Sequence, residues 1–433
     1  MSNNNNNPLE DESKFDTEKP VRIIIVGCGN RGYVYSQYAI ERPNRLQVVA
    51  VADPIQFRRE NVAKPFNLDS QYIYKDWRDI LKSKEKIADS VLIATPDTEH
   101  CEPAIAFAKK GYHLLVEKPL AITKSDCENI VKAVKENKVI LAVCHVLRYS
   151  PYNLKIKELI EKNYIGKLLN VQHLEPVGYY HNAHSYVRGN WSQEKTSTFM
   201  LMAKSCHDLD LMHFFINKKC KKVSSFGSLS YFKKENKPKE AGNSKICFEC
   251  PIINNCPYSA KTIYIDHFPW KKNTVVPTKE PTIEDVKEAL LNGSPYGRCV
   301  YECPNDVVDQ QVVILEYEQG ITATFSMVST TADMCIRKTR IFGSHGELEC
   351  NGDTIIWSDF IKDDKEVFRP NVIQNTRMVN HSSSDYYLIR SFVYAVATND
   401  PSQILSGPDD TLESHLQVFK AEESRLKNKV LSF

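Results

Sequence analysis

Three glycines with the spacing Gly-x-Gly-x-x-Gly directly follow an apolar run. That run, VRIIIV at residues 21–26, is typical of a strand buried on both faces of a parallel sheet, and residues 32–41 have a helical pattern. Glycines at this spacing allow a tight turn and let the backbone approach a pyrophosphate, which the positive end of the following helix attracts. The dinucleotide site that this pattern predicts is Gly27-Cys28-Gly29-Asn30-Arg31-Gly32.

An acidic residue, Asp53, ends the next apolar run at residues 46–52, about 20 residues after Gly32. A carboxylate in this place accepts hydrogen bonds from the ribose hydroxyls, and it repels a 2′-phosphate. Asp53 therefore favours NAD as the cofactor. Arg58 and Arg59 follow closely, which keeps NADP open as an alternative.

Two further polar motifs follow strand-like runs. TPDTEH at residues 95–100 comes after residues 90–94, and EKP at residues 117–119 comes after residues 113–116. The carboxyl ends of parallel strands meet at one sheet edge, where ligands bind. A Lys–Pro bond can be cis, which would aim the lysine sharply. The alternatives are a strand-ending turn and a solvated lysine. The residues expected at the cofactor edge are Thr95, Pro96, His100, Glu117 and Lys118.

The segment KSCHDLD at residues 204–210 would, if helical, place Lys204 and His207 on one face. A histidine accepts a proton from a sugar hydroxyl near neutral pH, and a neighbouring ammonium stabilises the developing alkoxide. The alternative is a histidine with only a packing role.

Thirteen cysteines in 433 residues, without an apolar secretory segment at the N-terminus, favour a reducing cytosol over a disulfide scaffold. Five of them gather in a segment with few large apolar runs, so a structural metal would help it to fold. Their spacing suits zinc and, less well, an iron–sulfur cluster, and buried free thiols are the alternative. The expected zinc ligands are Cys247, Cys250, Cys256 and Cys303, with Cys299 as the alternative to Cys303.

The composition is that of a globular protein, with 42% hydrophobic and 25% charged residues and a net charge of +2. It gives no indication of a nucleic-acid or membrane partner. Residues 1–20 are polar and rich in asparagine, so we expect a disordered tail. Residues 21–147 alternate strand-like runs, at 21–26, 46–52, 90–94, 113–116 and 139–143, with helix patterns, which predicts a doubly wound parallel sheet of the α/β class. Thr123 with Asp126 resembles a capping box and predicts a helix from there to Asn137.

Residues 148–433 predict a second α/β domain with an open, mostly antiparallel sheet and an insertion at about 232–305. One helix is expected at 153–163. The strand-like runs are 168–173, 222–231, 309–317, 322–328 and 337–342, and the closing helices are 384–399 and 409–427.

With these residues placed, the chain resembles the Gfo/Idh/MocA family, named after glucose–fructose oxidoreductase and inositol dehydrogenase. The segments that carry the resemblance are residues 27–32, Ala52-Asp53, Ala94-Thr95-Pro96-Asp97 with His100, EKPL at 117–120, RYSP at 148–151, HDLD at 207–210 and IFGSHGEL at 341–348.

The resemblance implies a Rossmann domain, NAD(P) chemistry on a sugar, polyol or related hydroxy compound, and homo-oligomers that pair through the open sheet. It implies that Lys118 contacts the reacting hydroxyl and that His207 is the acid/base. One departure is Ala203, which stands where the family has an aspartate, with Lys204 beside it. The residues expected to shape the substrate pocket are His145, Arg148, Trp191, Lys204 and Asp208.

The leading hypothesis is a cytoplasmic NAD-dependent oxidoreductase acting on a small carbohydrate-like substrate. A second hypothesis is a redox-neutral glycosidase that keeps its NAD bound and oxidises the sugar only transiently. A third is a dinucleotide-binding sensor without activity, which the departure at Ala203 favours.

Overall fold

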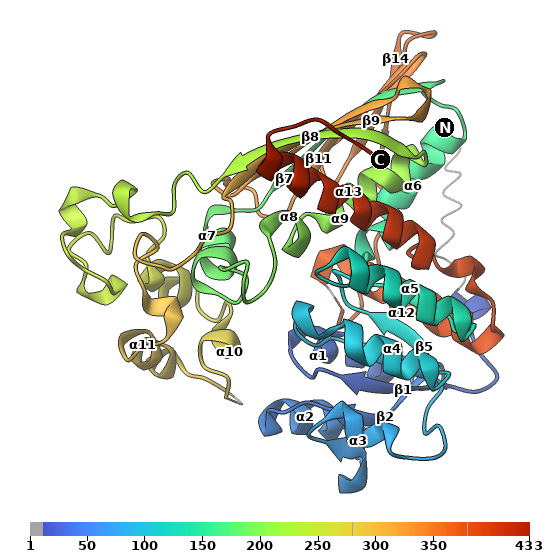
Figure 1. Ribbon diagram of the computed structural model, residues 1–433, viewed down its shortest axis with the longest axis horizontal. Coiled ribbons are helices and arrows are strands. Elements are labelled where there is room, and N and C mark those ends of the chain that lie inside the picture. The colour runs from blue at the N-terminus through green and yellow to red at the C-terminus, as the bar shows by residue number, and fades with distance from the viewer. Residues whose placement is uncertain (1–11, 279, 379) are drawn as a thin grey trace. The chain divides into compact units, whose positions relative to one another are not determined.

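The computed structural model describes residues 12–278, 280–378 and 380–433 (Figure 1). The chain divides into two compact units, each built from several segments. Unit 1 contains residues 1–168, 209–217 and 343–417, and unit 2 contains residues 169–208, 218–342 and 418–433.

Unit 1 contains a sheet of six parallel strands, five of which were predicted. The strands are β1 (Val21–Val26), β2 (Leu46–Ala52), β3 (Ile73–Tyr74), β4 (Ser90–Ile93), β5 (His113–Val116) and β6 (Leu141–Val143). Their order is β3-β2-β1-β4-β5-β6, and β1 pairs in parallel with both β2 and β4. The strand order therefore reverses at β1, where doubly wound sheets bind ligands beyond the carboxyl ends of the strands. The predicted α/β class is confirmed.

Some helices of unit 1 begin or end at local signals that the sequence contains. They include α1 (Asn30–Glu41), α2 (Gln56–Ala63), α3 (Trp77–Leu81), α4 (Cys101–Lys109), α5 (Lys124–Glu136), α6 (Pro151–Glu161) and α12 (Ser384–Thr398). The hydroxyl of Thr123 accepts a hydrogen bond from the N–H of Asp126 at 3.1 Å, so the predicted cap of α5 is confirmed. Gly111, with φ of +81°, follows α4 in the left-handed conformation that ends helices. Helices α4 and α5 pack on each other (Figure 1).

Unit 2 contains a mostly antiparallel sheet. Its strands are β7 (Leu168–Pro176), β8 (Cys220–Ser228), β9 (Gln310–Tyr317), β10 (Thr322–Val328), β11 (Lys338–Gly343) and β15 (Leu431–Ser432), in the order β11-β7-β10-β9-β8-β15. Strand β9 is antiparallel to β8 and β10, whereas β7 and β10 are parallel. In β9, Val313 and Leu315 are buried while Val312 and Ile314 are exposed, so one face of the sheet is covered and the other is open.

Several elements were not predicted. An antiparallel meander of β12 (Gly346–Cys350), β13 (Ile355–Asp359) and β14 (Asp364–Phe368) belongs to unit 1. Its last strand, DKEVF, is almost wholly exposed and therefore has no apolar alternation. The remaining α-helices are α7 (Tyr179–Asn182), α8 (Met200–Ala203), α9 (Cys206–Ile216), α10 (Lys272–Val275), α11 (Ile283–Leu291) and α13 (Pro408–Lys427). Of these, α13 corresponds to the closing helix that was predicted at 409–427.

The insertion at 232–305 consists of short helical turns with α10 and α11, and its only described ladder contact is a single bridge between Ile246 and Arg298. Its core is aromatic and is built from isolated residues, so the small number of large apolar runs in the sequence did not reveal it. The buried rings include Phe232, Tyr258, Tyr264, Tyr296 and Tyr301. Isolated aromatic residues between polar ones do not form a periodic pattern, although each buries a large area.

Part of the predicted tail lies outside the described residues, namely 1–11. Glu12–Phe15 form a short 3-10 helix in which Phe15 is buried, which differs from the disorder expected there. Among the described residues, no helix is both long and apolar enough to span a membrane.

Replacing Thr123 by Ala should lower the free energy of unfolding by about 1 kcal/mol, because the N–H of Asp126 loses its acceptor. Chemical denaturation followed by circular dichroism measures this change. Thr278→Ala, at an exposed position, is the matched control and should stay within about 0.5 kcal/mol of the parent. An unfolding curve of Thr123→Ala identical to that of the control would contradict the cap.

Candidate functional site

The glycine turn joins β1 to α1. Gly27 has φ of +89°, and a Cβ atom there would lie 2.4 Å from the carbonyl carbon of Ala94. A Cβ atom on Gly32 would lie 2.0 Å from the carbonyl oxygen of Gly27. Gly29 directly precedes Asn30, the first residue of α1. A Cβ atom on Gly29 would have no neighbour within 4 Å. The turn thus leaves open space at the positive end of α1, which suits a pyrophosphate.

Asp53, after β2, is tied to this turn and is only 6% exposed. One carboxylate oxygen accepts from the N–H of Cys28 at 2.8 Å, and the other accepts from the N–H of Ile55 at 2.8 Å. Arg59 donates to the carbonyl oxygen of Asp53 at 3.2 Å, whereas Arg58 is exposed. The glycine turn and the predicted ribose-binding carboxylate therefore form one hydrogen-bonded unit.

The guanidinium of Arg31 contacts two carboxylates. Its Nε donates to Oε1 of Glu117 at 2.6 Å, and its Nη2 donates to Oδ1 of Asp385 at 2.5 Å and to the hydroxyl of Tyr35 at 2.8 Å. Burial alone would raise the pKa of Asp385, but the charge of Arg31 lowers it well below its usual value. The Arg31 side chain thus holds Glu117, the residue before Lys118.

His100 connects two turns of the sheet edge and is fully buried. Its Nδ1 lies 2.7 Å from the carbonyl oxygen of Pro119, and its Nε2 lies 3.0 Å from that of Thr95. The Lys118–Pro119 peptide is cis, as the sequence allowed. Pro96 begins the short turn between them. His100 therefore links the turn after β4 to the turn that contains Lys118.

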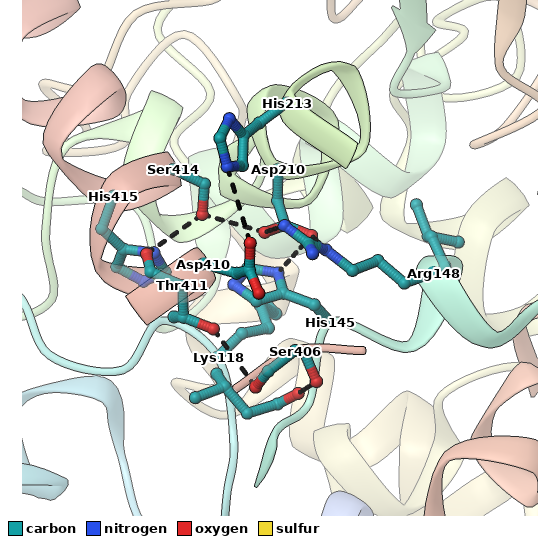
Figure 2. Close-up of polar contacts among 12 residues, drawn as sticks. Lys118, His145, Arg148, Asp210, His213, Ser406, Asp410, Thr411, Ser414 and His415 are labelled. Carbon is teal, nitrogen blue, oxygen red and sulfur yellow. Dashed lines mark hydrogen bonds and ion pairs between the residues drawn. The ribbon is translucent and has the colours of Figure 1, made fainter. Parts of the chain in front are cut away.

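Buried histidines surround the lysine turn (Figure 2). The Nε2 of His415 accepts a hydrogen bond from the N–H of Leu120 at 3.0 Å, and the rings of His145 and His415 meet edge to face at 5.3 Å. Burial lowers the pKa of His145 to about 4 and that of His415 to about 3, and the charge of Lys118 acts in the same direction. Both rings are therefore neutral at neutral pH, and His145, expected in the substrate pocket, is enclosed by protein.

Arg148 forms a buried ion pair with Asp210, with bonds of 2.7 and 2.8 Å (Figure 2). Arg148 also donates to the carbonyl oxygen of Leu405 at 2.7 Å, and the hydroxyl of Ser414 donates to Asp210 at 2.9 Å. Burial would raise the pKa of Asp210, but the charge of Arg148 lowers it to about 2. Arg148 was expected in the substrate pocket, and its guanidinium instead contacts protein groups.

In unit 2, Lys204 belongs to a cluster of buried charges. Its Nζ lies 3.1 Å from Oε1 of Glu175. The Nε of Arg337 lies 2.9 Å from Oε2 of Glu175 and 2.8 Å from Oδ1 of Asp208. His173 lies 3.2 Å from the same Asp208 oxygen. Two cations are thus balanced by two carboxylates, one of which is Asp208, expected in the substrate pocket.

The pKa of Lys204 follows from this cluster. Burial would lower it, but the charge of Glu175 raises it well above its usual value. Lys204 therefore keeps its proton at neutral pH and acts as a fixed positive charge. Glu175, from β7, supplies a carboxylate next to Lys204, while Ala203 occupies the position where one was expected.

Residues 204–210, considered above as one helix, are only partly helical. Helix α8 ends at Ala203 and α9 begins at Cys206, so Lys204 lies in the turn between them. His207 is in the first turn of α9 and is 6% exposed.

Trp191, expected in the substrate pocket, lies next to another aromatic residue. The centroid of its ring is 6.1 Å from the centroid of the Tyr186 ring.

Four of the five clustered cysteines, Cys247, Cys250, Cys256 and Cys299, line one cavity in unit 2. The thiol of Cys303 instead donates to the carbonyl oxygen of Cys299 at 3.3 Å. Across the described residues, no three or more His, Cys, Asp or Glu side chains are arranged to hold a metal ion. Zinc binding therefore stays a prediction.

Sequence reasoning missed Asp385, His415 and Glu175. Each is a fully buried polar residue. Asp385 and Glu175 lie next to apolar residues in a helix and a strand, and charged residues in such segments are rarely buried without a partner. This pattern signals a buried ion pair, but the partner, which is distant in sequence, has no local signal.

Two family models match the chain. Residues 21–145 match the NAD-binding Rossmann fold of an oxidoreductase family, and residues 157–406 match the C-terminal alpha/beta domain of the same family.

The chain matches only 51–60% of the length of the three curated relatives described next. The putative oxidoreductase YteT of Bacillus subtilis (strain 168) is 25% identical over 272 residues, which cover 61% of this chain and 60% of that protein. The scyllo-inositol 2-dehydrogenase (NAD(+)) of the same organism is 27% identical over 49% of this chain and 58% of its own. The 2,7-anhydro-N-acetylneuraminate hydratase of Escherichia coli (strain K12) is 28% identical over 47% and 51%.

Solved structures share the fold along nearly the whole chain. A levoglucosan dehydrogenase in complex with NADH superposes with a TM-score of 0.71 at 16% identity, covering 96% of this chain and 99% of that one. An oxidoreductase from Agrobacterium radiobacter in complex with NAD+, L-tartaric acid and magnesium has a TM-score of 0.68 at 14% identity, covering 96% and 98%. Because the two family models together match most of the chain, the resemblance seen in the motifs is confirmed, and the protein belongs to the Gfo/Idh/MocA oxidoreductase family.

Proposed function

We propose that the protein is an NAD-dependent oxidoreductase acting on a hydroxyl group of a carbohydrate-like substrate. The observation that carries this proposal is that the glycine turn after β1 and Lys118 after β5 follow strands of one parallel sheet and are joined by Arg31 and Glu117. The inositol dehydrogenases among the relatives support the substrate class.

The cofactor site is assembled from backbone and one carboxylate. The open position at Gly29 and the uncapped N-terminus of α1 would hold the pyrophosphate, and Asp53 would accept from the ribose hydroxyls. When bound, NAD takes up or returns the hydride of the reacting carbon.

Lys118 would lower the pKa of the reacting hydroxyl, because its positive charge stabilises the developing alkoxide. The N–H of Lys118 donates to Glu117 at 3.0 Å, and His100 and His415 contact the backbone of the next two residues. For His207 we propose the role of proton acceptor. Lys204 would contribute only its charge, since its proton is firmly held.

Two observations support the proposed compartment and oligomeric state. All thirteen cysteines are free thiols, which suits a reducing compartment such as the cytosol. Phe226 of β8 lies opposite Val312 of β9, and both are exposed on the open face of the sheet, which suits the expected homo-oligomer.

Redox-neutral chemistry is the second candidate, because one relative is named a hydratase rather than a dehydrogenase. The absorbance of NADH distinguishes the two. A dehydrogenase accumulates NADH with each turnover, whereas a redox-neutral enzyme converts its substrate with no net change.

Replacing Lys118 by Met should lower kcat/KM by about 100-fold or more, because the alkoxide loses its charge partner. NAD affinity, measured by calorimetry, should change by less than about threefold (under ~0.7 kcal/mol). Lys124→Met, on exposed α5, is the matched control and should keep full activity. Undiminished turnover in Lys118→Met would remove Lys118 from the mechanism.

Replacing Asp53 by Asn should weaken NAD binding about tenfold, or ~1.4 kcal/mol, and reduce the preference for NAD over NADP. The amide oxygen still accepts one hydrogen bond, but the charge that repels a 2′-phosphate is gone. Calorimetric titration with both dinucleotides measures the effect, with exposed Asp69→Asn as the control. Equal NAD affinity in Asp53→Asn and the parent would contradict the ribose contact.

A further inference from the structure

A cavity in the insertion of unit 2 is lined by cysteines from separate parts of the chain. Cys247 and Cys250 lie on one turn, Cys256 follows on the next, and Cys299 arrives from far along the sequence. Most of the other lining residues are apolar or aromatic, together with one guanidinium. Four cysteines that line one cavity supply the kind and number of donors that a structural zinc centre uses.

The backbone already holds these cysteines in place. The N–H of Cys250 donates to the carbonyl oxygen of Cys247 at 3.1 Å, which closes the Cys-x-x-Cys segment into a tight turn. The N–H of Cys299 donates to the carbonyl oxygen of Lys245 at 2.8 Å, next to the bridge between Ile246 and Arg298. This contact fixes Cys299 beside the Cys247 turn although some 50 residues separate them.

Arg188 is the second, independent observation. It is buried, its Nε donates to the carbonyl oxygen of Arg298 at 2.7 Å, and its Nη2 donates to that of Tyr258 at 2.7 Å and to Sγ of Cys247 at 3.4 Å. Its Nη1 is buried with no hydrogen-bond partner, and within the described part of the chain no carboxylate forms an ion pair with it. A buried cation without a counter-charge is costly, so the site calls for an anion.

We propose that Cys247, Cys250, Cys256 and Cys299 bind one Zn²⁺ as thiolates, with Arg188 as the balancing cation. Four thiolates and Zn²⁺ carry a net charge of about −2, which supplies the anion that the guanidinium lacks. Each thiol gives its proton to solvent when it binds the metal. No electron transfer is involved. Binding requires the side chains to turn toward the cavity centre, because the described thiols are not yet arranged around a single point.

This ligand set differs from the one expected from spacing alone. Cys303 was expected as the fourth ligand, with Cys299 as the alternative, but the thiol of Cys303 donates to the carbonyl oxygen of Cys299, and Cys303 does not line the cavity. Cys299 lines the cavity and is fixed by its own N–H. The metal would therefore join the Cys247–Cys256 turns to the Cys299 turn and stabilise an insertion whose described residues form no sheet of their own.

Metal content of the full-length chain, purified under reducing conditions, tests the proposal. Elemental analysis should find about one zinc per chain, and Cys250→Ser and Cys256→Ser should each lose most of it. Cys101→Ser, a half-buried cysteine of α4, is the matched control and should keep its zinc. A parent chain without zinc, even after a Zn²⁺ titration of the reduced protein, would overturn the proposal. Iron with acid-labile sulfide in place of zinc would do the same.

Two more variants separate this site from a general need for thiols. Cys303→Ser should retain zinc, whereas Cys299→Ser should lose it; the reverse result would overturn the ligand set. Arg188→Met should release zinc to a competing chelator at least about tenfold more readily, since the charge that balances the thiolates is removed. If a cysteine variant fails to fold, the parent serves alone. Its unfolding temperature should fall on chelation and recover with added Zn²⁺, and an unchanged temperature would count against the site.

Discussion

The charge of Arg31 connects the cofactor turn to the lysine turn. Its guanidinium lies between Glu117, which follows β5, and Asp385, which belongs to α12, and Arg31 itself is in the first turn of α1. Removing one partner of a buried ion pair leaves an uncompensated charge at a cost of about 3–5 kcal/mol. The same contacts therefore fix the N-terminus of α1 and the backbone of Lys118 relative to each other. The proposed chemistry depends on the distance between these two parts of the site.

More of the polar groups in and near the family motifs than expected bond to other groups of the protein. Arg148 pairs with Asp210, Asp208 pairs with Arg337, and both rings of His145 and His415 are neutral and enclosed. Such groups fix the orientation of their neighbours, as supporting residues around active sites do. In the proposed mechanism the substrate hydroxyl is contacted by Lys118 and His207, and the groups that support the lysine turn, among them His100 and His415, are fully buried.

Local patterns carried most of the correct predictions. The β1 run, the glycine turn and the cap at Thr123 each depend on neighbours within a few residues, so the sequence is sufficient. The contacts of Asp385, His415 and Glu175 join segments that are far apart in the sequence. The neighbouring residues in the sequence therefore do not indicate which partner each one contacts. The exposed strand β14 and the aromatic core of the insertion have no regular spacing of apolar residues, so hydrophobic periodicity could not predict them.

Gly29 differs from its two neighbours in the turn. Gly27 and Gly32 are required by the protein, since a side chain at either would collide with the backbone. At Gly29 a side chain would meet no protein atom, and the residue has no positive φ. Alanine would therefore fit the folded chain at this position. The absence of a side chain at Gly29 leaves the turn open on the side where the proposed pyrophosphate would approach.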